Sequence, residues 1–307
     1  MSSAPSFPLL QRYLSRLHEG GAMNTRLWVA ADGCAFGRYF NASITSAFQP
    51  VRSGYDGRIV GFEAFARSHA VSGQGLCIWR LLDQAASDEE SVELDRLCRM
   101  LHAMNFFRQS PSTGKDLYLS VHARLLAAVD SSHGIAFSRI LEQLQLPREQ
   151  VVLQLPQVEP QQTWALDYVA DNYRRNGFRL ALNAATPKEA LILIERVPCE
   201  AVKIDARSLG NADAVPDVQL LLKLLERCAE RASRVILKRV QGEAMRKLVL
   251  RLASAHLPLH VQGFEWDLPT AALVTAPGNP AGTTLQPGGA SSSTVVDFPR
   301  LPKIGVA

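Results

Sequence analysis

The stretch FQPVRSGYDGRIVGFEAFAR, residues 48–67, decides the fold of this chain of 307 residues. Two runs around it, Ser46–Arg52 and Arg58–Arg67, are rich in apolar and aromatic residues and predict two β-strands. The connection GYDG, residues 54–57, is typical of a hairpin turn. The sequence therefore predicts that the main domain opens with two antiparallel strands.

Beyond this hairpin, short apolar runs alternate with stretches of helical periodicity. The expected strands cover residues 117–121, 151–155, 178–182, 201–204, 235–237 and 259–261. The expected helices cover residues 76–86, 89–107, 133–144, 163–176, 188–196, 217–232 and 243–255. Parallel strands need crossovers of helix length, so this order predicts an α/β fold with a parallel sheet closed into a (β/α) barrel. An open, doubly wound sheet is the alternative.

The composition narrows the function classes. With 47% hydrophobic and 20% charged residues, the chain has the makeup of a folded protein. No apolar run is long enough to span a bilayer, and the first residues do not have the pattern of a signal peptide, so we expect a cytoplasmic protein without membrane insertion. The formal charge of +4 comes from scattered Lys and Arg, which argues against nucleic acid as a partner. The five Cys form no CxxC pair, so we expect reduced thiols and no zinc site.

Three segments differ in composition. Residues 1–40 predict an N-terminal helical extension, with apolar residues at helical spacing over 9–17. Residues 41–275 carry the strand and helix patterns of the barrel domain. Residues 276–307 are rich in Gly, Pro, Ser and Thr and predict a disordered low-complexity tail. Within the barrel, Trp164, Tyr168 and Tyr173 of one predicted helix are interpreted as core residues.

Several motifs, taken in order, resemble those of the EAL domain family. Residues 48–51 and 57–67 resemble the opening of that family, FQPI followed by GxIxGxEALxR. Residues 94–96 resemble its LDR motif, 177–182 its GxRLAL strand, 202–205 its LKID motif and 262–264 its QGY motif. The resemblance spans residues 41–272 and implies a modified (β/α)8 TIM-like barrel of EAL type, with the first strand antiparallel.

Active members of this family are phosphodiesterases that hydrolyse cyclic di-GMP with Mg²⁺ or Mn²⁺. The resemblance places their metal-ligand and catalytic positions on Glu63, Ser120, Gln154, Asn183, Lys203, Asp205, Lys238, Gln241 and Gln262 of this chain. Four of these residues match the family, namely Glu63, Lys203, Asp205 and Gln262. The other five replace the family's acids and asparagine by neutral or basic side chains.

This loss of acids does not depend on the alignment, because residues 151–157, 180–186 and 235–241 contain no Asp or Glu at all. Two hard divalent cations require several carboxylate and amide oxygens, so we expect Mg²⁺ and Mn²⁺ binding to be lost and no metal or other cofactor to be needed. The sequence then predicts a pseudoenzyme that acts as a regulator in bacterial cyclic di-GMP-linked signalling. A weakly active, metal-dependent cyclic di-GMP phosphodiesterase is the alternative.

The resemblance also implies a ligand groove lined by Gln49, Pro50, Glu63, Phe65, Arg67 and Pro269. A metal-independent cyclic di-GMP sensor is one reading of these residues, since Arg67 and Lys238 could pair with phosphate and Phe65 could stack on a base. A protein-interaction adaptor with an unidentified regulatory protein as partner is the other, and a homodimer is compatible with both. A purely structural reading also stays open, in which Glu63, Lys203 and Asp205 form a buried ion cluster and Arg67 pairs with one of its acids.

Overall fold

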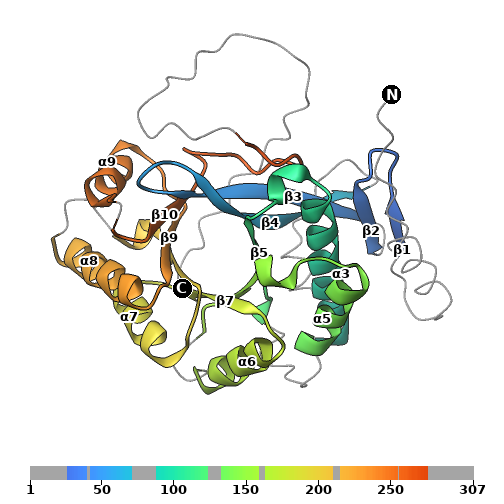
Figure 1. Ribbon diagram of the computed structural model, residues 1–307, viewed down its shortest axis with the longest axis horizontal. Helices are drawn as coiled ribbons and strands as arrows, with labels where there is room; N and C mark the ends of the chain where they lie inside the picture. The colour runs from blue at the N-terminus through green and yellow to red at the C-terminus, as the bar shows by residue number, and fades with distance from the viewer. Residues whose placement is uncertain are drawn as a thin grey trace, which may run out of the picture.

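A closed barrel forms the centre of the computed structural model, which describes residues 26–39, 42–70, 88–123, 133–158, 163–209, 215–254 and 256–275 (Figure 1). The opening hairpin consists of β3 (Ala42–Ser53) and β4 (Ile59–Ala70). Six strands follow: β5 (Asp116–Ser120), β6 (Val151–Leu155), β7 (Arg179–Ala184), β8 (Ala201–Asp205), β9 (Arg234–Lys238) and β10 (Leu259–Gln262). The helices expected over 9–17 and 76–86 and the tail 276–307 lie outside the described residues.

The strand pairing confirms the predicted barrel with one antiparallel strand. From β4 to β10 each described strand pairs in parallel with the next. β3 is antiparallel to both β4 and β10, and through these two pairings it closes the ring. The open, doubly wound alternative is therefore excluded.

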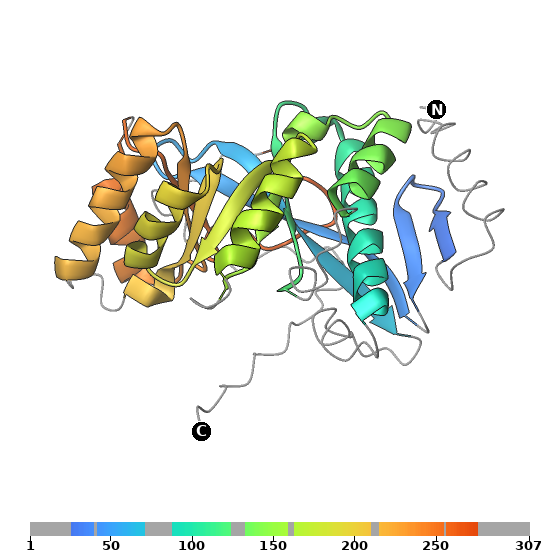
Figure 2. The same ribbon diagram turned by 90° about the horizontal axis from the view of Figure 1, so that it is seen from below.

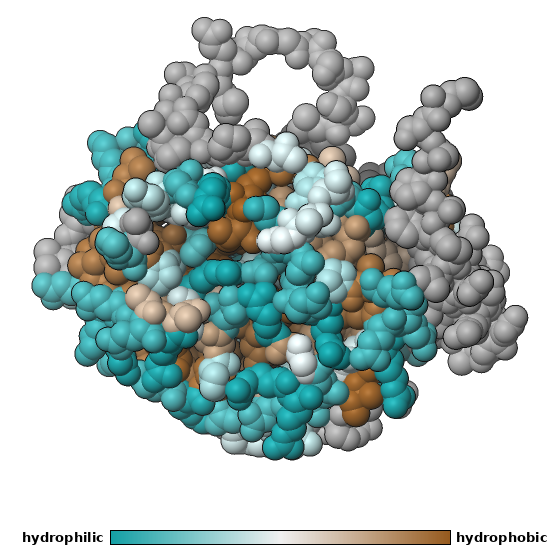
Figure 3. Space-filling model, in the orientation of Figure 1, coloured by the Kyte–Doolittle hydropathy of each residue, from teal (hydrophilic) through white to brown (hydrophobic). Residues whose placement is uncertain are grey.

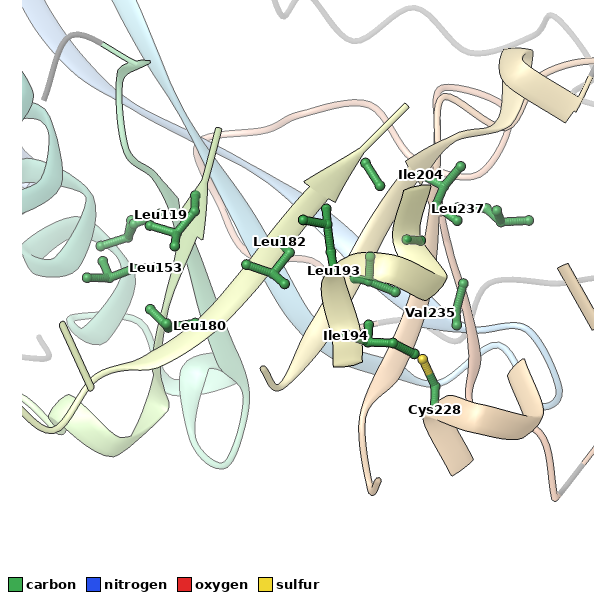
Figure 4. Packing of buried hydrophobic residues seen from close by; sticks show 14 of the residues in the cluster. Leu119, Leu153, Leu180, Leu182, Leu193, Ile194, Ile204, Cys228, Val235 and Leu237 are labelled. Carbon is green, nitrogen blue, oxygen red and sulfur yellow. The ribbon is translucent and has the colours of Figure 1, made fainter. Parts of the chain in front are cut away.

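The helices cover the outside of the strands (Figure 1). They are α3 (Asp88–Phe107), α5 (His133–Gln143), α6 (Thr163–Arg175), α7 (Pro187–Arg196), α8 (Val215–Glu230) and α9 (Glu243–Leu252), with short 3-10 turns at Ser110–Ser112, Arg148–Gln150 and Ala206–Leu209. Outward-facing strand residues and the inner faces of these helices form the largest hydrophobic cluster. Figure 4 shows part of this cluster, with Leu193 and Ile194 of α7 between strand residues and Cys228 of α8.

Every second residue of each strand points into the barrel, and these inward side chains fill the barrel in three layers. The middle layer is apolar and comprises Val51, Tyr118, Val152, Ala181, Ala201 and Ile236. At the amino-terminal strand ends, Arg179 pairs with Asp116 (2.6 Å) and Glu200 (2.5 Å), and Arg234 pairs with the same two acids. At the carboxyl-terminal ends, the same alternation places a layer of polar side chains over the apolar layer.

Two further strands, β1 (Arg26–Val29) and β2 (Ala35–Tyr39), were not expected from the sequence. β2 pairs with the first residues of β3, so this hairpin extends the barrel sheet, and it projects beyond α3 (Figure 2). A second hydrophobic cluster, which includes Leu27, Ile44 and Leu97, fills the space between the hairpin and α3. Gly37 allows this packing, because a Cβ there would lie 2.8 Å from Leu97.

The interpretation of the α6 aromatic residues as core is correct only for Tyr173, which is 3% exposed. Trp164 and Tyr168 are 71% and 50% exposed. The helix buries a different stripe, made of Leu166, Val169, Ala170 and Tyr173 at spacings of three and four residues. Trp164 and Tyr168 are four residues apart, so they share the opposite face.

Hydrophilic residues cover most of the face shown in Figure 3, and hydrophobic residues reach it in separate patches. Among the described helices, none combines the length and the hydropathy that crossing a membrane requires.

Candidate functional site

The polar layer at the carboxyl-terminal strand ends contains most of the predicted site residues. The strand register explains this, because Gln49 lies opposite Glu63, Ser120 beside Gln154, Asn183 beside Lys203, and Lys238 beside both Asp205 and Gln262. Each of these residues is an even number of positions from an apolar residue of the middle layer, or is a register partner of one that is. Their side chains therefore share the inner face of the barrel.

Lys203 lies at the centre of this layer and is 1% exposed. Its ammonium group donates hydrogen bonds to Glu63 Oε2 (2.7 Å), Gln154 Oε1 (2.6 Å) and Gln262 Oε1 (3.0 Å). The same ammonium lies 5.5 Å from the ring centroid of Tyr118 in the apolar layer below. The three hydrogens of the lysine are thus all used inside the protein.

The amides of the layer complete the network around Glu63. Gln154 Nε2 donates to Glu63 Oε1 (3.0 Å) and to Ser120 Oγ (3.2 Å). Gln262 Nε2 donates to Glu63 Oε2 (2.7 Å) and to Gln49 Oε1 (3.0 Å). Both carboxylate oxygens of Glu63 therefore have partners supplied by this chain.

Glu63 is ionised in this setting. Burial alone would raise the pKa of its carboxyl, but the charge of Lys203 and the three hydrogen bonds outweigh burial and hold that pKa below its usual value. The resulting Glu63–Lys203 ion pair is the part of the buried ion cluster that the structural reading of the sequence anticipated.

Lys238 and Asn183 form a second contact in the layer. Lys238 Nζ donates to Asn183 Oδ1 (2.7 Å), and Asn183 Nδ2 donates to the Leu155 carbonyl oxygen (2.8 Å). Burial, together with the nearby charge of Lys203, lowers the pKa of Lys238.

Asp205 does not join Glu63 and Lys203. Its carboxylate accepts from Arg207 Nη2 and from Arg239 Nη1, each at 2.6 Å. Burial opposes its ionisation, but Arg207 and then Arg239 dominate and lower the pKa of Asp205 far below its usual value. The carboxylate is therefore fully engaged by two arginines. Gln241 also lies apart, since it is exposed in the loop after β9.

The residues of the expected ligand groove lie in two places. Gln49 is part of the polar layer, and its Nε2 donates to the Asp267 carbonyl oxygen (2.7 Å). Arg67 Nη2 donates to the Pro269 carbonyl oxygen (2.9 Å), so Arg67 pairs with a backbone oxygen in place of an acid.

Two further groove candidates are placed by the strand alternation. Phe65 is partly exposed and lies two residues after Glu63 on β4, so the two side chains share one face of the strand. Pro50 is buried and alternates with Gln49, which puts it on the strand face that carries Phe48 and away from the polar layer.

Three charged residues near the site were missed by the sequence analysis. Arg207 follows Asp205 by two residues, and this local spacing was the available signal. Arg239, which has a left-handed backbone conformation (φ 59°), contacts Asp205, and Asp267 pairs with Arg52 of β3 at 2.6 Å. Neither of these two contacts has a sequence signal, because both depend on how the barrel closes.

The barrel with one reversed strand and a polar layer at the carboxyl-terminal strand ends defines a class of α/β barrel proteins whose site lies at that end. The sequence model of the EAL domain matches residues 40–264, and the chain belongs to this family. No curated protein sequence is significantly similar to the chain.

Solved EAL structures share this fold at low sequence identity. The FimX EAL domain from Pseudomonas aeruginosa, bound to cyclic di-GMP, superposes with a TM-score of 0.62 at 16% identity, covering 88% of this chain and 98% of that domain. A standalone EAL protein from Vibrio cholerae, also bound to cyclic di-GMP, gives a TM-score of 0.57 at 15% identity and covers 79% and 98% of the two chains. Klebsiella pneumoniae BlrP1, with manganese and cyclic di-GMP, gives 0.61 at 16% identity, and the match spans 75% of this chain but 57% of that one.

The residues present do not fit the divalent metal ions that the family implies. A pair of Mg²⁺ or Mn²⁺ ions needs several oxygen ligands of net negative charge. Here Asp205 is held by two arginines, Gln154 and Asn183 carry no charge, and Lys238 adds a positive charge to the same layer. Within the described part of the chain, no group of three or more His, Cys, Asp and Glu is placed to hold a metal.

Proposed function

We propose that this EAL domain does not hydrolyse cyclic di-GMP and acts as a regulatory domain that binds the nucleotide without a metal ion. The observation that supports this proposal most is the contact between Lys238 and Asn183 (2.7 Å), because the resemblance places acids of the family at both positions. The Lys238 ammonium group therefore lies in a layer in which a metal-dependent enzyme needs negative charge.

The charges in this layer oppose metal-dependent catalysis. A divalent cation about 4 Å from a single ammonium group would be repelled by roughly 8 kcal/mol at an effective dielectric constant near 20. Lys238, which stands where the family has an acid, would act in this way, and Gln154 and Asn183 supply no negative charge to offset it. Without a metal, water is not activated as a nucleophile near neutral pH.

The positive charge that remains at the same end of the barrel supports nucleotide binding. Arg67 uses one of its nitrogens on Pro269 and keeps further donors, and its planar fork suits a phosphate group. Phe65, two residues after Glu63 on β4, offers a ring on which a guanine base could stack. Cyclic di-GMP supplies both groups, and it is the ligand in the FimX and Vibrio cholerae structures.

Calorimetry with cyclic di-GMP, first in EDTA and then with Mg²⁺, tests this proposal. We expect binding of equal affinity under both conditions, and a loss of about tenfold or more for Arg67→Ala. Arg58→Ala is the matched control, because Arg58 is exposed in the β3–β4 turn and pairs there with Asp56 (2.5 Å). No binding at millimolar nucleotide would overturn the sensor and leave the protein-interaction adaptor.

A further inference from the structure

Lys238 is a partly buried cation that lacks an acidic partner. Its ammonium group bonds to the neutral amide oxygen of Asn183 at 2.7 Å, and in the described residues it takes part in no ion pair. An ammonium group has three hydrogens, so two remain for other acceptors. Partial burial makes a lone positive charge costly, and an anion placed beside it would relieve that cost.

The acids around Lys238 are already engaged. Asp205, its register neighbour on β8, accepts from Arg207 and Arg239. Glu63 pairs with Lys203. In the first turn of α7, Glu189 accepts from the Ala185 backbone N–H (2.7 Å), and in the loop after β10, Glu265 accepts from the Gly242 backbone N–H (3.2 Å). Among the pairs formed by Glu63 and Asp205, three cations face two acids, and Lys238 adds a further positive charge.

Lys238 is also fixed in place. Asn183 Nδ2 is anchored on the Leu155 carbonyl oxygen, so its Oδ1 has a set direction toward the ammonium group. The next residue, Arg239, has φ of 59°, which is unfavourable for a residue with a side chain, and its guanidinium is tied to Asp205. Strained backbone of this kind is often found where a site is held in a particular shape.

We propose that Lys238, oriented by Asn183, forms a phosphate-binding site for one phosphate group of the nucleotide at the carboxyl ends of β7 and β9. The assignment of the ligand as a nucleotide rests on the proposed function, whereas the phosphate-binding site itself requires only a phosphate oxygen. A lysine serves this purpose as a point charge. Asn183 acts as a positioning residue, since it holds the ammonium group and leaves two of its hydrogens free.

The test uses the full chain in EDTA, with inorganic phosphate and cyclic di-GMP as separate probes. Nitrogen-detected NMR of lysine side chains should show phosphate shifting the Lys238 Nζ signal while the exposed Lys247 stays unchanged. Lys238→Met should weaken binding of both probes by about tenfold or more, because one charged hydrogen bond is lost. Lys247→Met is the matched control, since Lys247 is 71% exposed on α9.

Asn183→Asp distinguishes a phosphate-binding role of Lys238 and Asn183 from a role in packing alone. The new carboxylate would pair with Lys238 inside the protein, so we expect phosphate binding to be lost. The melting temperature should change little, because the new ion pair offsets the lost hydrogen bond to the Leu155 carbonyl oxygen. If both Lys238→Met and Asn183→Asp bind phosphate with the affinity of the unchanged chain, the proposed phosphate-binding site is wrong. Unchanged nucleotide binding by Lys238→Met would contradict the phosphate-binding site at Lys238 and would agree with the proposed function. A shift of the Lys238 Nζ signal with phosphate, but no binding of cyclic di-GMP, would support the phosphate-binding site and contradict the proposed function.

Discussion

Lys203 shows how one residue determines the chemistry of the whole layer. A nearly inaccessible ammonium group is tolerable because Glu63 neutralises it and two glutamines accept its other hydrogens. The resemblance to the EAL family placed Glu63, Lys203 and Gln154 among the site residues. The separation of Asp205 from this group was not predictable, because the pull of Arg207 and Arg239 depends on loop geometry after β8 and β9.

Lys203→Met should destabilise the protein by about 3–5 kcal/mol, because it leaves the buried carboxylate of Glu63 without its counter-charge. Urea unfolding followed by circular dichroism measures the change. The double variant Lys203→Met with Glu63→Gln should recover part of the loss, since no charge is then stranded. A single variant as stable as the original chain would show that Glu63 is not buried as an ion.

The pH dependence of stability belongs to the same pair. The pKa of Glu63 is lowered from 4.5 in the folded state, so the unfolded chain takes up a proton at a higher pH than the folded one. The stabilisation from Glu63 is therefore complete above the ordinary pKa of a glutamate and declines as the pH falls below it. Urea midpoints from about pH 7 down to pH 3 should fall more steeply for the original chain than for Glu63→Gln. Parallel curves would contradict the assignment.

At the scale of elements, α3 fixes the β1–β2 hairpin to the barrel. The side chain of Asn105 accepts from the Ala35 backbone N–H (2.7 Å) and donates to the Ala35 carbonyl oxygen (2.8 Å), as a neighbouring strand would. Most helices and barrel strands could be predicted from periodicity. This hairpin could not, because strands of four and five residues contain too few alternations to give a signal.

Asn105→Ala should cost about 1–3 kcal/mol, since the buried Ala35 N–H loses its side-chain acceptor and the Ala35 carbonyl oxygen loses one of its donors. Amide hydrogen exchange should become faster in β2 and stay slow in β6, which lies in the barrel away from this contact. Unchanged exchange in β2 would mean that its pairing with β3 alone holds the hairpin in place.

At the scale of the whole molecule, the barrel interior has an apolar middle between two charged ends. The two ends differ in what they leave over. The amino-terminal end balances Asp116 and Glu200 against Arg179 and Arg234, whereas the carboxyl-terminal end has a surplus of positive charge. A balanced cluster favours a structural role, and an unbalanced one favours ligand binding.

Asp116→Asn should lower the stability of the entire barrel by about 2–3 kcal/mol, because both arginines lose a carboxylate partner; their partial solvent exposure limits the loss. Thermal unfolding should stay a single transition at a lower midpoint. Binding of cyclic di-GMP below that midpoint should be unaffected, since the variant lies at the opposite end of the barrel. Two separate transitions would contradict a barrel that unfolds as one unit.

The most direct test of the central claim is a turnover assay of the full chain with cyclic di-GMP and Mg²⁺ or Mn²⁺, with products separated by chromatography. We predict no hydrolysis above the rate without protein, under conditions in which calorimetry detects bound nucleotide. Metal-dependent turnover that Glu63→Ala abolishes would contradict the account, because it would show that this layer of lysines and amides still assembles a metal-dependent phosphodiesterase site.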